Sequence, residues 1–310
     1  MLSVLEGLFI FVAASESVLG VLGDGFIGTV YFIEFVKNKK VSMIGFILTG
    51  LAISRICLIL LIIIDGFNKI FFPDMYASST LIDHISYGWT IINQSSVWFA
   101  TSLSMFYFLK IANFSQRVFL WLKSRTNKVL PLLMGSLLIS WLITFPQVIK
   151  VINDNRMKKV NTTWQFSEEA RNQFLTNQFL FSLGVFVFFL LTLITSFLLI
   201  ISLWKHRRQM QLNITRFRDP STEAHMKAMK ILISFIILFI LYFIGITIEI
   251  LCSTVTRNKL LFLFGLSTTT IYPWGHSLIL ILGNSTLKQY FLRALQQFKR
   301  HEQENPSRTQ

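Results

Sequence analysis

The chain has 310 residues, of which 53% are hydrophobic and 14% are charged, and its formal net charge at pH 7 is +14. This composition leaves little room for a separate soluble domain, so we expect one membrane-embedded domain over residues 1–310. In a soluble protein such a charge would indicate a nucleic-acid partner. Here the basic residues flank apolar segments, which indicates membrane topology and no nucleic acid.

Seven apolar stretches follow one another along the chain and are separated by short polar segments. At about 1.5 Å of rise per residue, roughly 20 helical residues span the ~30 Å hydrocarbon core, so each stretch is long enough to cross it. Because backbone groups in lipid must hydrogen-bond within their own segment, the sequence predicts an all-α bundle of seven transmembrane helices. The stretches cover residues 7–35, 41–64, 85–109, 129–149, 174–204, 231–255 and 260–282.

The placement of Lys and Arg predicts the orientation of the bundle. Most of the 29 basic residues follow the first, third and fifth stretches or lie in the tail, residues 285–310. By the positive-inside rule the amino end is outside and the tail is cytoplasmic, as in a multi-pass protein of the plasma membrane. In that tail Leu287, Tyr290, Phe291 and Leu295 recur at helical spacing, which predicts a short amphipathic helix on the inner leaflet.

The same topology selects among the Asn-x-Ser/Thr sequons. Asn93 lies within the third stretch, whereas Asn113, Asn213 and Asn284 belong to the predicted cytoplasmic side. Asn161 lies in the longest outer loop. We therefore predict a glycan at Asn161 only.

Two charged residues lie deep within apolar stretches, Asp24 in the first and Arg55 in the second. Counted from the inner helix ends, their depths agree within about 3 Å. A lone charge at the membrane centre costs roughly 2.5–3.5 kcal/mol on insertion scales, so the two side chains are expected to pair. Both a purely structural pair and a pair with a switching role fit the sequence.

The third stretch places Ser86, Trp89 and Asn93 on one helical face. A large aromatic beside a buried amide suits a site that binds varied organic molecules by stacking and one orienting hydrogen bond. An Asn in a membrane helix can equally serve as a contact between helices. From the residues alone, the two interpretations stay open.

Five short motifs occur in order on the expected helices: LAISR at 51–55, FYFLKIANFS at 106–115, LIISL at 199–203, STEAH at 221–225 and HSLIL at 276–280. In this combination the whole chain resembles the type 2 taste receptors, the bitter receptors, and two stretches, 47–55 and 272–277, look most like one subgroup of them. The rhodopsin-like Asp-Arg-Tyr motif does not end the third stretch. One position departs from the family, since Asp24 stands where Asn is usual.

The resemblance implies a G-protein-coupled receptor with a ligand pocket in the outer half of the bundle, and neither an enzyme nor a protein with a cofactor or metal. It assigns Trp89 and Asn93 to that pocket, and it carries pocket positions over to Gln178, Tyr242, Leu266 and Thr269. Glu249 shares the face of Tyr242, where it either attracts cationic agonists or turns to headgroup water.

On the cytoplasmic side the resemblance implies docking of a heterotrimeric G protein of the gustducin type, with phospholipase C and calcium signalling downstream. The motifs nominate residues for activation or structure in the bundle: Asp24, Arg55, Tyr107, Lys110, Ser202, His276 and Ser277. A pheromone-type chemosensory receptor and a small-molecule transporter are the alternatives. The segment at 106–115 argues against the first, and the absence of a duplicated half argues against the second.

Overall fold

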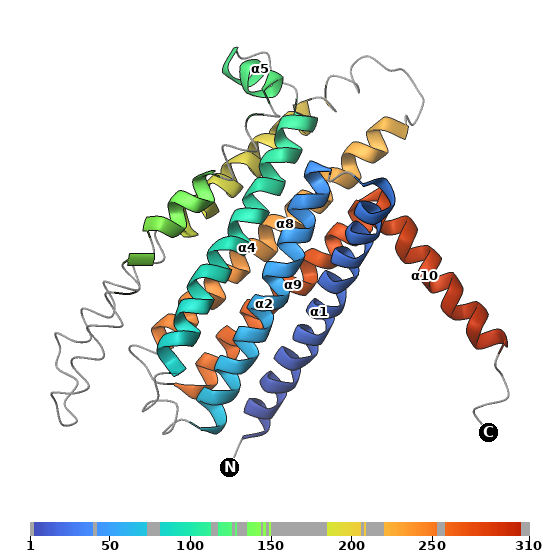
Figure 1. Cartoon of the computed structure of the whole chain (residues 1–310). Coiled ribbons are helices and arrows are strands. Elements are labelled where there is room, and N and C mark those ends of the chain that lie inside the picture. The colour runs from blue at the N-terminus through green and yellow to red at the C-terminus, as the bar shows by residue number, and fades with distance from the viewer. Residues whose placement is uncertain are drawn as a thin grey trace.

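The structure is a computed structural model, and it describes a bundle of long helices. The residues described are 3–39, 42–72, 81–112, 117–125, 128, 135–143, 145–146, 149, 185–205, 208, 220–252 and 258–304. Within these ranges no strand occurs. Figure 1 shows the long helices lying side by side, while the last helix leaves the bundle at an angle.

The helices follow the order of the apolar stretches. The labelled ones are α1 (Val4–Asn38), α2 (Met43–Phe71), α4 (Leu81–Ile111), α5 (Arg117–Ser124), α8 (Pro220–Leu251), α9 (Lys259–Gly283) and α10 (Ser285–Glu304). Helical segments at 135–143 and Val185–Lys205 lie where the fourth and fifth stretches are predicted. α2 runs past the predicted limit at residue 64, and this extension carries the charged residues Asp65 and Lys69.

Side-chain caps explain where several helices begin. Ser3 and Glu6 form a reciprocal capping box at the start of α1, with Ser3 Oγ accepting from the Glu6 amide at 3.2 Å. Ser42 caps α2, and the side-chain oxygen Oδ1 of Asn258 accepts from two backbone amides at the start of α9. These residues satisfy amide groups that the first helical turn leaves without a partner.

The described helices are apolar on their outer surface, and they bury both apolar and polar side chains. Four of them are long and apolar enough to cross a membrane by length and composition: Val4–Asn38, Met43–Phe71, Val185–Lys205 and Met229–Leu251. α4 and α9 are not among these four, and both bury polar side chains such as Asn93, Gln94 and Thr269. On the outer surface Leu22 and Phe32 stay more than half exposed, as suits lipid contact.

α9 occupies a central place, because it packs against both α1 and α8, while α2 packs between α1 and α4. The α8–α9 contact is especially close at Gly245. A Cβ atom there would lie 2.5 Å from Thr269 Oγ1 and 2.8 Å from the Thr269 amide nitrogen, so only glycine fits without a shift. This glycine fixes Thr269 against α8.

The tail contains the predicted amphipathic helix, α10. Asn284 caps it by accepting from the Leu287 amide at 3.3 Å, and its side-chain amide donates to Tyr31 Oη on α1 at 3.0 Å. Leu287 is fully buried, and Phe291 packs edge to face on Phe26. The first turns of α10 are thus joined to the bundle.

Candidate functional site

A hydrogen bond between α4 and α8 forms the centre of the predicted pocket. Tyr242 Oη donates to Asn93 Oδ1, and both residues are 1% exposed. Because each side chain satisfies the other, the two polar groups can remain buried among apolar residues. The structure therefore brings together two of the predicted pocket residues from helices far apart in the sequence.

Other predicted pocket residues surround this bond. Trp89 is half-buried and lies one helical turn from Asn93 on α4, and Leu266 on α9 is buried in the same apolar cluster. Below them the ring of Tyr242 lies 5.0 Å from that of Tyr272, which in turn lies 5.4 Å from Phe239. These aromatic rings form an apolar floor suited to stacking contacts.

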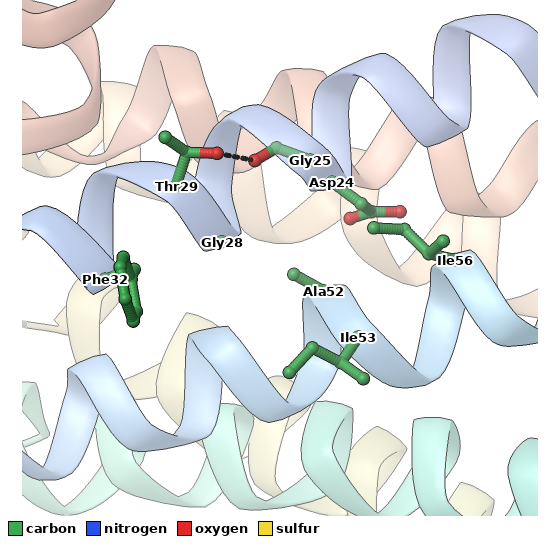
Figure 2. A pocket seen from close by; sticks show the side chains of 8 residues that line it. All are labelled: Asp24, Gly25, Gly28, Thr29, Phe32, Ala52, Ile53 and Ile56. Carbon is green, nitrogen blue, oxygen red and sulfur yellow. Dashed lines mark hydrogen bonds between the residues drawn. The ribbon is translucent and has the colours of Figure 1, made fainter.

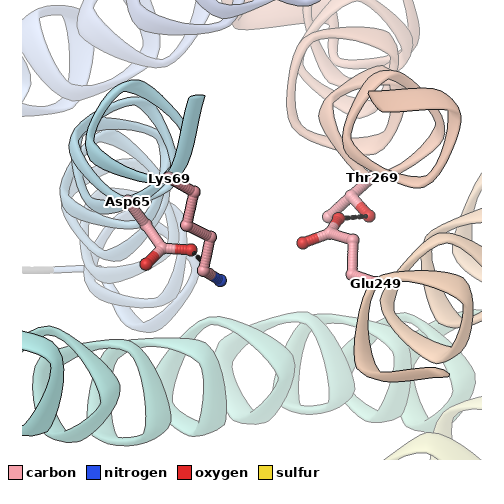
Figure 3. Close-up of polar contacts among 4 residues, drawn as sticks. All are labelled: Asp65, Lys69, Glu249 and Thr269. Carbon is pink, nitrogen blue, oxygen red and sulfur yellow. Dashed lines mark hydrogen bonds and ion pairs between the residues drawn. The ribbon is translucent and has the colours of Figure 1, made fainter. Parts of the chain in front are cut away.

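Glu249 points into the bundle. Its carboxylate accepts a hydrogen bond from Thr269 Oγ1 at 2.6 Å, and Figure 3 shows it facing α2. On α2, Lys69 and Asp65 form an ion pair at 2.6 Å, one helical turn apart. Glu249 on α8 and Lys69 on α2 thus face each other in the bundle, an acidic group opposite a basic one.

Sequence reasoning missed the Asp65–Lys69 pair because it ended the second stretch at residue 64 and assigned Lys69 to a loop. The i, i+4 spacing of an acid and a base was a signal that the helix continues. It also assigned no role to Tyr272, although this residue begins the stretch 272–277 and lies one helical turn before the predicted His276.

A chain of contacts runs inward from the pocket to the predicted charges. The Tyr272 ring stacks on His276, with centroids 5.7 Å apart, and the Arg55 guanidinium lies over the Tyr272 ring at 4.6 Å. Arg55 also hydrogen-bonds His276 Nδ1. A chain of contacts thus connects Tyr242 through Tyr272 to His276 and Arg55.

The expected direct ion pair between Asp24 and Arg55 is wrong. Among the described residues the ion pair found is Asp65–Lys69, whereas Asp24 Oδ1 accepts from Ser277 Oγ at 2.6 Å. The physical reason is that α9 supplies closer partners, Ser277 for Asp24 and His276 with Tyr272 for Arg55. Arg55 still acts on Asp24 through its charge, without contact.

The remaining nominated residues lie toward the end of the bundle that is predicted to be cytoplasmic. Tyr107 packs with Tyr31 in an apolar cluster, and the exposed Lys110 lies over the Phe106 ring at 5.6 Å. Ser202 is buried on the helix Val185–Lys205. Ser86 belongs to α4, whereas Gln178 and Asn161 lie outside the described residues.

Hydroxyl groups join α4 to the helix Val185–Lys205, a contact that no motif indicated. Thr101 Oγ1 bonds Thr192 Oγ1 at 2.7 Å, and Ser104 Oγ bonds Thr195 Oγ1 and Ser196 Oγ, each at 2.9 Å. Such contacts between membrane helices hold a bundle together. In the described part of the chain no three His, Cys, Asp or Glu side chains gather as metal ligands. The arrangement is suited to binding a molecule.

Comparison with known proteins gives one consistent result. The profile of the taste receptor protein family (TAS2R) matches residues 1–299. Taste receptor type 2 member 10 of Papio hamadryas is 66% identical over 299 residues, and that of Homo sapiens is 64% identical, each with 96% of both chains covered. Taste receptor type 2 member 107 of Mus musculus is 52% identical over 299 residues. The likeness of stretches 47–55 and 272–277 to one subgroup is confirmed, and the subgroup is member 10.

Proposed function

The chain belongs to the taste receptor type 2 family, and from this membership we propose where its agonist binds and how binding reaches the cytoplasm. Membership makes it a bitter taste receptor in a membrane, with a seven-helix bundle and no enzymatic role. The agonist binds in the outer half of the bundle, between α4, α8 and α9. The buried bond between Asn93 and Tyr242 is the observation that carries this proposal, because it places a hydrogen-bonding pair on an aromatic floor.

The chemistry of the site supports small organic agonists of varied shape. Trp89 offers a half-buried indole for stacking, and the Asn93–Tyr242 pair offers one donor or acceptor to orient a ligand. Glu249 adds an acidic group at the outer opening that favours cationic agonists. Lys69 opposes it, so a cation gains less there than a lone carboxylate would give.

Activation requires that the agonist bind the active arrangement of helices better than the resting one, because equal affinity shifts no population. An agonist that changes the Asn93–Tyr242 contact also changes the position of the Tyr242 ring. That ring touches Tyr272, which touches Arg55 and His276 near the middle of the bundle. We propose that the agonist pocket shifts the positions of α8 and α9 through this sequence of contacts.

At the inner end we propose docking of a heterotrimeric G protein of the gustducin type, at the plasma membrane. Lys110, Lys205 and Arg208 are exposed basic groups at the inner ends of α4 and the helix Val185–Lys205. They can meet acidic groups of the partner, in addition to their role in topology. Phospholipase C and calcium release follow from such coupling.

A calcium assay tests the proposal. Cells that express the chain with a gustducin-type G protein are exposed to a panel of bitter compounds, and at least one should raise cytosolic calcium. The response should disappear in cells without the G protein. If cells without the G protein still take up a compound and show no calcium response, the result would instead support the transporter alternative.

Glu249→Gln should lower the potency of cationic agonists by about five-fold and leave the potency of neutral agonists unchanged, since a partly screened charge pair contributes on the order of 1 kcal/mol. The matched variant Lys69→Met should have the opposite effect and raise the potency of cationic agonists. Concentration–response curves for cationic and neutral agonists measure both. An equal loss for neutral agonists in Glu249→Gln would reject the counter-ion role.

Asn161→Gln should abolish the glycosidase-sensitive shift of the receptor band on a gel, because the other sequons lie in helices or on the proposed cytoplasmic side. Asn213→Gln serves as the control and should leave the shift unchanged. A glycosylated band in Asn161→Gln would overturn the orientation of the whole bundle.

A further inference from the structure

A groove of about 280 Å³ lies between α1 and α2 on the outer surface of the bundle, away from the pocket proposed above. α1 contributes Gly25, Gly28, Thr29 and Phe32 to its lining, and α2 contributes Ala52, Ile53 and Ile56 (Figure 2). Phe32 and Ile53 are 62% and 57% exposed, so the groove opens toward the lipid.

The groove exists because its walls carry little side-chain volume. A Cβ atom at Gly25 would meet nothing within 4 Å, and one at Gly28 would meet only the Ala52 Cβ at 3.8 Å. The Thr29 hydroxyl is turned to its own helix and donates to the Gly25 carbonyl at 2.8 Å. The floor therefore offers an apolar surface to an occupant.

Asp24 lines the same groove and supplies one polar group. The residue is 1% exposed, and its Oδ1 accepts from Ser277, but Oδ2 has no hydrogen-bond partner among the described residues. Figure 2 shows its carboxylate between the two helices, beside Ile56. A buried acceptor without a partner gains from any donor that reaches it, and rotation of the partly exposed Ile56 side chain would open the way.

We propose that this groove binds a small, membrane-soluble molecule with one hydrogen-bond donor, a phenol or an alcohol, which donates to Asp24 Oδ2. The volume is at the lower end of that of ligand pockets, about 300 Å³, which limits the occupant to a small molecule. The agonist pocket is not required for this binding.

The depth of Asp24 excludes a lipid headgroup as the donor. Asp24 lies roughly 21 Å from the inner end of α1 at Asn38, and the groove runs from it toward that end. A sterol or phospholipid would have to hold its polar end at the membrane centre and its apolar body near the headgroups, which is the costly orientation. A molecule that dissolves wholly in hydrocarbon meets no such cost.

Photolabelling of the full-length receptor in membranes tests the proposal. The probe is an alkylphenol that carries a diazirine, and its methyl ether is the matched probe without a donor. We expect adducts on residues 25–32 and 52–56 by mass spectrometry, with about ten-fold less labelling by the ether, as for the loss of one hydrogen bond to a carboxylate. Equal labelling by both probes would overturn the role of Asp24.

Two matched variants test the groove itself. Gly25→Leu fills it and should remove the adducts, while Gly7→Leu, on the same helix and also without neighbours within 4 Å, should leave them unchanged. Ile56→Ala should increase labelling, because it uncovers the carboxylate. Labelling that persists in Gly25→Leu would reject the groove as the site. If the adducts disappear and receptor copies instead cross-link to one another through this face, the occupant is a second copy of the receptor. That result would overturn the small-molecule proposal.

Discussion

Asn93→Ala should reduce agonist potency by roughly ten- to hundred-fold at unchanged surface expression. The substitution removes the acceptor of the Tyr242 hydroxyl and leaves that hydroxyl buried without a partner. Such a loss costs about 1–3 kcal/mol, which corresponds to the expected range of potency. Concentration–response curves in the calcium assay, normalised to surface labelling, measure the effect.

Tyr242→Phe completes a double-mutant cycle with Asn93→Ala. If the bond between the two side chains positions the agonist, the double variant should lose less than the sum of the two single variants. Thr247→Val is the control, because Thr247 lies on the same helix with its hydroxyl bonded to its own backbone and its side chain exposed. Additive losses would show that the bond between Asn93 and Tyr242 does not position the agonist.

Arg55→Leu should lower the surface level of the receptor more than any other single change considered for this chain. It removes the cation that balances Asp24 in an apolar interior, and an uncompensated buried charge costs about 3–5 kcal/mol. Asp24→Asn alone should be tolerated, because an Asn side chain can still accept from Ser277. Surface labelling of epitope-tagged receptor in intact cells measures the level of each variant.

The double variant Arg55→Leu with Asp24→Asn separates charge from contact. If charge balance dominates, removing both charges should restore most of the surface level even where signalling stays impaired. If the double variant is no better than Arg55→Leu, the loss comes from the contacts of Arg55 with His276 and Tyr272. The second result would show that Arg55 acts through α9 and not through Asp24.

Apolar length and the order of motifs were sufficient to predict the helical bundle and the family. Helical periodicity placed Trp89 and Asn93 on one face, and the family resemblance added Tyr242, which the structure joins to Asn93. Depth along a helix, however, gives only one coordinate. Asp24 and Arg55 share a depth, but the rotation of each helix and the insertion of α9 side chains decide their partners, and neither can be counted along a sequence.

The end of α2 shows a second limit of the sequence. Charged residues at the end of an apolar stretch resemble a loop, so Asp65 and Lys69 were not expected on a helix that continues to Phe71. Their opposition to Glu249 depends on how α2 and α8 face each other, which is a tertiary property. A charge facing the interior can therefore be recognised only once the neighbours of the helix are known.

Because Gly245 fits tightly against Thr269, α8 pivots about this contact with α9. With no free space between the two helices there, α8 can tilt about the contact far more easily than it can slide past it. The end of α8 at Pro220 lies 25 residues away, or about 37 Å of helix. A tilt of about 5° therefore moves that end by about 3 Å. A small displacement of α8 near a bound molecule thus produces a larger displacement at the Pro220 end of the helix. A displacement of that size changes the surface that a partner protein would contact.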